Sequence, residues 1–138
     1  MRQHWVMDYE TLSNCFVAVF IDIKSDNQEI FVIHKLQNDF ENFISFLERN
    51  IDYNEWHVSF NGLGFDGHIT EYIIREQDSL RTMEAEDIAA WIYSKAQYII
   101  EKQNAKEFLD FSPRDLKIKQ LDVFKLNHWD NAAKRSSL

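Results

Sequence analysis

The chain has 138 residues, 45% hydrophobic and 14% aromatic, which predicts a single globular domain spanning residues 1–138. Its 23 acids and 15 bases give a formal charge of −8, which argues against non-specific coating of nucleic acid and is compatible with a metal-dependent or acidic interaction protein. No apolar run has membrane-spanning or signal-peptide length and the single Cys15 excludes an internal disulfide, so a cytosolic, reducing setting is expected.

Three strands are expected to open the domain. The first is a short apolar and aromatic run at residues 5–8. The nearly continuous β-branched and aromatic run 15–23 is typical of a strand buried on both faces. The turn signal S-D-N then leads into the apolar run 29–34, which predicts a hairpin. These first three strands are therefore predicted to be antiparallel.

Helices and strands alternate in the rest of the chain. The elements expected there are a helix capped by Asn38 or Asp39 that ends near Asn50, a strand at 56–60, a short helix around Ile69, a helix from about 84 to 106 and a strand at 117–126. The sequence thus predicts an α/β fold in which helices flank a mixed sheet of about five strands.

Two acids near the start of the chain are candidates for chemistry. Asp8 and Glu10 lie two positions apart in or just after the first strand, so their side chains project from the same face. Two carboxylates held close together raise each other's pKa unless a cation lies between them. The alternative is that D-Y-E is simply the polar, solvent-facing end of a strand.

The stretch F-N-G-L-G-F-D-G-H, residues 60–68, contains all three glycines of the chain. It follows a predicted strand and precedes a helix, which places Asp66 where sheet enzymes gather reactive groups. Glycine permits positive φ and the close approach of a backbone or ligand. The alternative is a tight turn in which Asp66 caps the helix. If the first and fourth strands are neighbours, Asp8, Glu10 and Asp66 converge in an oxygen-rich site suited to Mg²⁺ or Mn²⁺.

The two motifs together resemble those of a known family. M-D-Y-E-T, with Asp8 and Glu10, is similar to the first motif of the DEDD 3′–5′ exonucleases of RNase H-like fold, and F-N-G-L-G-F-D, with Asn61, Phe65 and Asp66, is similar to the second. The closest likeness is to the exonuclease domain at the start of some phage DNA polymerases. It covers nearly all of this chain but only the amino-terminal part of the family's domain.

The resemblance implies proofreading by two-metal phosphodiester hydrolysis, with two Mg²⁺ or Mn²⁺ ions, in the cytoplasm of a bacterial or phage-infected cell. Asp8 would bridge both ions, Glu10 would hold the ion beside the nucleophile, and Asp66 would hold the other. The family's third motif, a Tyr or His ahead of a final Asp, lies on a helix beyond the fifth strand and is missing here. Asp122, expected within a strand, and Asp130 are poor substitutes, so weak metal binding and little activity are expected.

The resemblance also implies contacts with the 3′ end of single-stranded DNA. Asn61 would bind a phosphate or sugar, or else only fix the turn. Phe65 would stack on the terminal base, or else pack in the core. Leu12 would lie near the same base. The remainder of a polymerase chain is a possible partner for the truncated domain. Apolar surface left on the sheet by the missing last helix would favour self-association.

A second function class fits the composition equally well. A small acidic protein could use its negative charge and its four tryptophans to bind a protein partner or to mimic nucleic acid without catalysis. The two hypotheses differ in the placement of Asp8, Glu10 and Asp66. Convergence of these acids favours the nuclease, whereas scattered acids favour the interaction protein.

Overall fold

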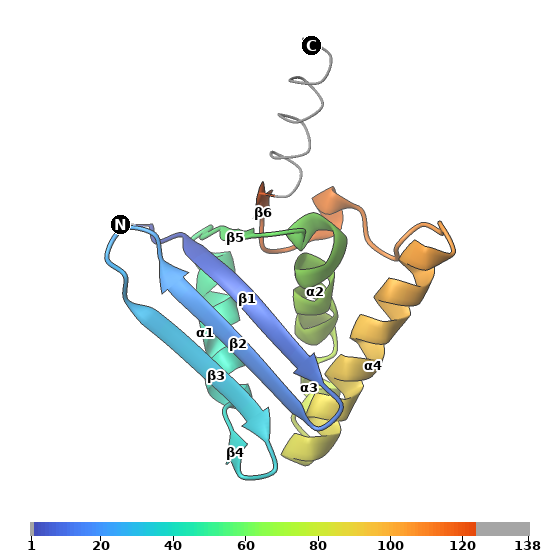
Figure 1. The fold of residues 1–138 in the computed structure, drawn as a ribbon. Helices are drawn as coiled ribbons and strands as arrows, with labels where there is room; N and C mark the ends of the chain where they lie inside the picture. Colours follow the sequence, from blue (N-terminus) through green and yellow to red (C-terminus); the bar gives the residue numbers. More distant parts are fainter. Residues whose placement is uncertain (1, 124–138) are drawn as a thin grey trace.

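The computed structural model describes residues 2–123, which form a mixed sheet of six strands with helices packed on one side (Figure 1). The strands are β1 (Trp5–Leu12), β2 (Cys15–Asp22), β3 (Gln28–His34), β4 (Gln37–Asn38), β5 (His57–Ser59) and β6 (Gln120–Asp122). Their order across the sheet is β4-β3-β2-β1-β5-β6. The pairs β1–β2, β2–β3 and β3–β4 are antiparallel, whereas β5 runs parallel to β1 and β6 parallel to β5.

The helices follow the sequence expectations closely. They are α1 (Phe40–Asp52), α2 (Gly67–Arg75), α3 (Gln77–Leu80) and α4 (Ala85–Asn104), with a π-helical turn η1 (Gly62–Asp66) and a 3₁₀ turn η2 (Pro113–Asp115). The turns η1 and η2 and the short elements α3 and β4 had no clear periodic signal, because hydrophobic spacing cannot be read over so few residues. Within residues 2–123, no helix combines the length and the apolar character needed to cross a membrane.

The α/β fold and the antiparallel start of the sheet are confirmed. The sheet has six strands rather than about five because β4 adds a two-residue edge beside β3. The last strand is shorter than predicted: β6 covers Gln120–Asp122, and the preceding 117–119 are not in it. The rest of the predicted strand, Asp130 and the expected lack of a closing helix fall on residues 124–138, outside the described range.

The core lies between the sheet and its helices. On β2, Phe16, Ala18 and Phe20 are fully buried while the residues between them are only half-buried. Phe20 packs against Phe46 with ring centroids 4.6 Å apart, and Phe31 against Phe43 at 5.3 Å, so α1 closes over β2 and β3. The prediction that β2 is buried on both faces is wrong, because the described helices cover only one side of this antiparallel part of the sheet.

The other face of the sheet remains open in the described part of the chain. Val6, Leu12, Ile30 and Leu121 are exposed there by 44%, 55%, 52% and 41%. These aliphatic side chains share the face with Asp8 and Glu10, because alternate residues of β1 point to the same side. Exposed aliphatic side chains gathered on one face of a sheet can mark a contact surface. Self-association through it stays a prediction.

A buried polar network fixes β5 beside β1. The carboxylate of Glu55, 2% exposed, accepts hydrogen bonds from the backbone N–H of Gln3 (3.1 Å), the indole of Trp5 (3.2 Å) and the amide of Asn50 (3.0 Å). The side-chain oxygen of Asn50 lies 2.7 Å from Nε2 of His57 and can only accept. Burial lowers the pKa of His57 to about 3, so the neutral ring donates this bond.

Replacing Glu55 by Gln should therefore weaken the fold. The side-chain nitrogen of Gln cannot accept a hydrogen bond, so one of the buried N–H donors would lose its partner. The remaining hydrogen bonds would be weaker, because they would no longer be made to a charged carboxylate. We expect Glu55→Gln to lower the free energy of unfolding by about 2 kcal/mol, measured by urea denaturation. The matched control is Glu48→Gln, because Glu48 lies exposed on α1. Equal stability of the two variants would contradict this role for the network.

Candidate acidic site at the edge of the sheet

The first and fourth predicted strands are neighbours, as the candidate site requires. β5 pairs in parallel with β1, so the chain leaving β5 enters η1 at the same end of the sheet toward which β1 carries Asp8. Asp8 is exposed on the open face, whereas Asp66, the last residue of η1, is 7% exposed. Burial raises the pKa of the Asp66 carboxyl to about 7, helped by the negative charges of Asp8 and Asp122. Asp66 is thus partly protonated near neutral pH.

Asp122 is the acid whose importance the sequence did not reveal. It ends β6, is 3% exposed, and its carboxylate accepts the backbone N–H groups of Asn61 (2.8 Å) and Leu63 (3.1 Å). Both carboxylate oxygens therefore bind the glycine-rich loop after β5. An acid at the end of a parallel strand next to β5 could have been a signal, but the pairing of β6 with β5 is visible only in the folded chain.

The glycines of the loop serve close packing rather than positive φ. No glycine has a positive φ; the left-handed residue is Asn61, with φ of 70°. A Cβ on Gly62 would lie 2.2 Å from Oγ of Ser59, and one on Gly67 would lie 2.6 Å from the backbone oxygen of Gly62. The close-approach role predicted for glycine is therefore the one the fold uses, because η1 and the first turn of α2 press against β5 and against their own backbone.

Asp66 does not cap α2. No hydrogen bond from its side chain to the helix start is present in the described structure. Its backbone oxygen instead accepts from the hydroxyl of Thr70 (3.0 Å), and Thr70 in turn meets the hydroxyl of Tyr9 at 2.6 Å. Burial raises the pKa of Tyr9, and the negative charge of Asp66 raises it further. This chain of contacts connects α2 to the buried side of β1 and leaves the Asp66 carboxyl for other partners.

The acids that interact with Asp66 differ in part from the predicted set. The charges of Asp8 and Asp122 both act on Asp66, whereas Glu10 lies about 7 Å further along β1 on the face of Asp8. Within residues 2–123, no three His, Cys, Asp or Glu side chains are arranged so that they could hold a metal ion. The carboxylates have the oxygen chemistry that Mg²⁺ or Mn²⁺ prefers, but they do not form a closed ligand set.

The three predicted substrate residues lie in different surroundings. Asn61 is half-buried at the start of the loop, with its backbone held by Asp122. Phe65 packs against the core, which was the alternative considered for it. Leu12 is 55% exposed at the end of β1, four residues and about 13 Å along the strand from Asp8. Asn61 is therefore bound through its backbone to one of the acids, Phe65 directly precedes Asp66 in the chain, and Leu12 lies away from Asp8 along β1.

A hollow of about 320 Å³ lies beside Asp8 on the open face. Its walls include Val6 and Val58, the exposed ring of Phe60, and Ser59 from the end of β5. Ser59 is 4% exposed, and its hydroxyl finds no hydrogen-bond partner among residues 2–123. Asp8 thus borders a space that is large enough for a small ligand.

The raised pKa of Asp66 predicts a pH-dependent stability. Between pH 3.8 and about 7 the folded state binds more protons at Asp66 than the unfolded state does, so stability falls as pH rises through this window and levels off above it. Asp66→Asn mimics the protonated form. We expect this variant to be more stable than the parent at pH 8 by on the order of a few kcal/mol, and equal to it near pH 3.5.

Thermal or urea unfolding at several pH values measures this difference. Asp52→Asn is the matched control, because Asp52 is exposed at the end of α1. The same pH profile for Asp66→Asn and the parent would show that Asp66 ionises normally.

The packing around the loop makes a second prediction. The Cβ of Gly67→Ala would meet backbone, whereas that of Gly64→Ala would meet the side chains of Asn61 and Gln103, which can move. We expect Gly67→Ala to cost about 1–3 kcal/mol of stability and Gly64→Ala clearly less. Urea denaturation of the pair gives the comparison, and a stable Gly67→Ala would mean that η1 is not tightly packed.

Comparisons of this chain with protein-family models, with curated proteins and with solved structures find no match.

Proposed function

We propose that this chain is the amino-terminal part of an RNase H-like 3′–5′ exonuclease domain of a phage-type DNA polymerase, acting on the 3′ end of single-stranded DNA. The sheet supports the proposal. The first three strands are antiparallel, as expected for this fold, and β5, the fourth predicted strand, lies beside β1, as the candidate site requires. Asp8 comes from β1 and Asp66 from the loop after β5, as the two motifs require.

The placement of Asp8 and Asp66 at the same end of the paired strands β1 and β5 is the observation that carries the proposal. These acids are 58 positions apart in the sequence, yet Asp8 lies close enough to raise the pKa of Asp66. Burying a carboxyl group beside two other acids lowers the stability of the fold. Such an arrangement is common where a cation or a reacting group binds, and it favours a nuclease over an interaction protein with scattered acids.

Each acid has a distinct task in this proposal. Asp8, at the edge of the open hollow, would face both the cation and the scissile phosphate. Asp66 would release its proton when the cation binds, and Glu10 would approach from the same face of β1. Asp122 is a positioning residue, because both of its oxygens hold the loop. A bound Mg²⁺ or Mn²⁺ supplies an activated water and stabilises the departing 3′ oxygen.

The activity of this chain by itself is expected to be low. The Tyr or His that would position the attacking water, and the final aspartate, belong beyond the fifth strand in the family that the sequence resembles. With the carboxylates of residues 2–123 forming no closed ligand set, cation binding should be weak. Supplying a segment that carries the family's third motif, as part of a polymerase chain or separately, should then strengthen both cation binding and cleavage.

Proton release on cation binding tests the proposal directly. Near pH 7 Asp66 is partly protonated, so Mn²⁺ binding should release a fraction of a proton per site. Titration calorimetry in two buffers of different ionisation enthalpy measures this number. We expect weak binding with proton release in the parent chain, loss of the release in Asp66→Asn, and loss of binding in Asp8→Asn.

Asp52→Asn serves again as the control and should behave as the parent. Incubation of each protein with a 5′-labelled single-stranded DNA and Mn²⁺ then measures shortening from the 3′ end. Absence of Mn²⁺ binding at Asp8, together with an intact DNA strand, would overturn the proposal. The remaining candidate would then be the acidic interaction protein, because its acids need not bind a cation.

A further inference from the structure

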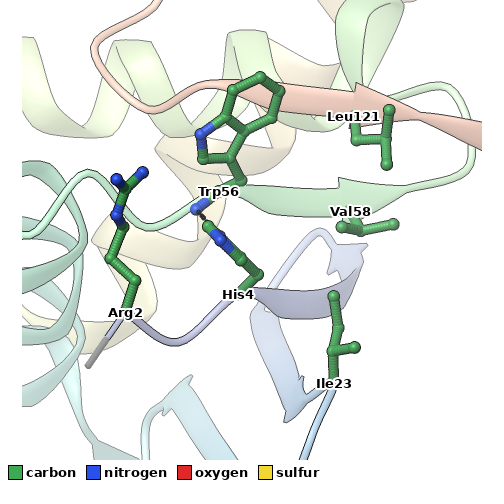
Figure 2. A pocket seen from close by; sticks show the side chains of 6 residues that line it. All are labelled: Arg2, His4, Ile23, Trp56, Val58 and Leu121. Carbon is green, nitrogen blue, oxygen red and sulfur yellow. Dashed lines mark hydrogen bonds between the residues drawn. The ribbon is translucent and has the colours of Figure 1, made fainter.

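A second hollow, of about 390 Å³, lies on the same open face of the sheet, toward the amino-terminal end of β1 (Figure 2). It is lined by side chains from the first residues of the chain, from the end of β2 and from β5 and β6. These are Arg2, His4, Ile23, Trp56, Val58 and Leu121. Figure 2 shows the indole of Trp56 and the three aliphatic side chains around a common space, with Arg2 and His4 at one end. Its volume falls within the range of small-ligand sites.

The strand register joins this hollow to the one beside Asp8. Val6 pairs with Val58, and Val58 pairs with Leu121, so three aliphatic side chains form a row across the face. Both hollows include Val58 in their walls. The two hollows together are called the groove below. His4 precedes Val6 by two residues and Asp8 follows it by two, so about 13 Å of extended chain separate His4 from Asp8.

The backbone of Trp56 is held in place by two hydrogen bonds. Its backbone N–H donates to Nδ1 of His4 (3.0 Å), and its backbone oxygen accepts the N–H of Trp5 (3.0 Å). The acceptor role of Nδ1 places the proton of neutral His4 on Nε2, where it remains a donor. The ammonium of Lys119 lies 5.7 Å from the centre of the indole ring. A half-buried indole with a cation beside it offers a flat surface on which a planar ring can stack.

The two ends of the groove have opposite charge. The chain has a formal charge of −8, and the far end of the groove carries the carboxylate of Asp8. Among the six residues that line the second hollow, however, the group with a fixed charge is the guanidinium of Arg2, and Lys119 adds a second cation nearby. A ligand suited to this end is therefore planar and carries a negative group, because an apolar planar ring alone would leave the cations without a partner.

We propose that the hollow formed by Arg2, His4, Ile23, Trp56, Val58 and Leu121 is a subsite for one base and its phosphate in a single strand whose 3′ end lies at Asp8. The inference rests on the proposed function and extends it along the strand. The base stacks on Trp56 and covers the aliphatic floor, while Arg2 and Lys119 contact the phosphate. Stacking on an aromatic ring beside cations is the general means by which single strands are bound without sequence preference.

Binding without a metal separates this inference from the nuclease proposal. Fluorescence anisotropy of a labelled short single-stranded oligonucleotide is measured in EDTA. We expect Trp56→Leu to weaken binding about tenfold, the loss typical of one stacked base. Trp91→Leu is the matched control and should bind as the parent, because Trp91 lies half-buried on α4, which packs on the opposite side of the sheet. A double variant, Arg2→Ser with Lys119→Ser, should reduce the slope of log K against log salt by about 0.7 for each phosphate that the protein no longer neutralises.

Arg2 and Lys119 are exposed, so the double variant tests the site even if Trp56→Leu fails to fold. Equal oligonucleotide affinity of all variants would overturn the subsite, and so would a tyrosine-containing acidic peptide that binds at Trp56 more tightly than the oligonucleotide does. Trp56-dependent DNA binding without Mn²⁺ binding at Asp8 would support the subsite and overturn only the nuclease proposal. Mn²⁺ binding at Asp8 with Trp56-independent DNA binding would have the reverse meaning.

Discussion

The parallel pairing of β5 with β1 is the constraint on which the acidic site depends. β5 has only three residues, and its register with β1 consists of the pairs Trp5 with His57 and Val6 with Val58. So short a ladder has few hydrogen bonds of its own. Glu55 lies just before β5, and its carboxylate compensates by accepting hydrogen bonds from Gln3 and Trp5 at the start of β1 and from Asn50 of α1. A buried carboxylate is tolerated there because its oxygens are satisfied by several donors.

The position of β5 then determines the geometry of the loop that follows it. The loop turns at Asn61, the one residue there with a left-handed backbone, and its N–H groups point to Asp122 on the neighbouring strand. Asp122 therefore has two physical effects. Its oxygens hold the loop in place, and its charge helps to keep Asp66 protonated. The backbone of the loop and the ionisation of Asp66 are coupled through this one side chain.

The open face of the sheet combines groups that are usually kept apart. Exposed aliphatic side chains lie between carboxylates at one end of this face and the indole of Trp56, with two cations nearby, at the other end. This separation follows from the course of the chain: Arg2 and His4 precede β1, whereas Asp8 lies within β1 on the same face as Val6. A protein with a strong net negative charge can thus still offer a local surface suited to phosphate, because the field near a site depends on the closest charges.

Local patterns in the sequence determined most of the fold. Aromatic and β-branched runs predicted β1, β2 and β3, and helical spacing predicted α1, α2 and α4, because each of these elements buries a regular stripe of side chains. The two motifs also identified Asp8 and Asp66 as candidates, because the position of an acid relative to a predicted strand can be read directly from the sequence. The π-helical shape of η1 and the short strand β4 were not predictable in this way, and the strand predicted at 117–126 is longer than β6.

The relations between distant elements were decided only by the tertiary structure. Asp122 could be recognised as part of the acidic cluster only after β6 had paired with β5. The open second face of β2 and the burial of Glu55 likewise depend on which helices pack where. The sequence by itself determined which side chains could form strands, helices and an acidic pair. Strand pairing decided which of them meet and which become buried, because burial and electrostatic contact depend on distances across the sheet that no local pattern contains.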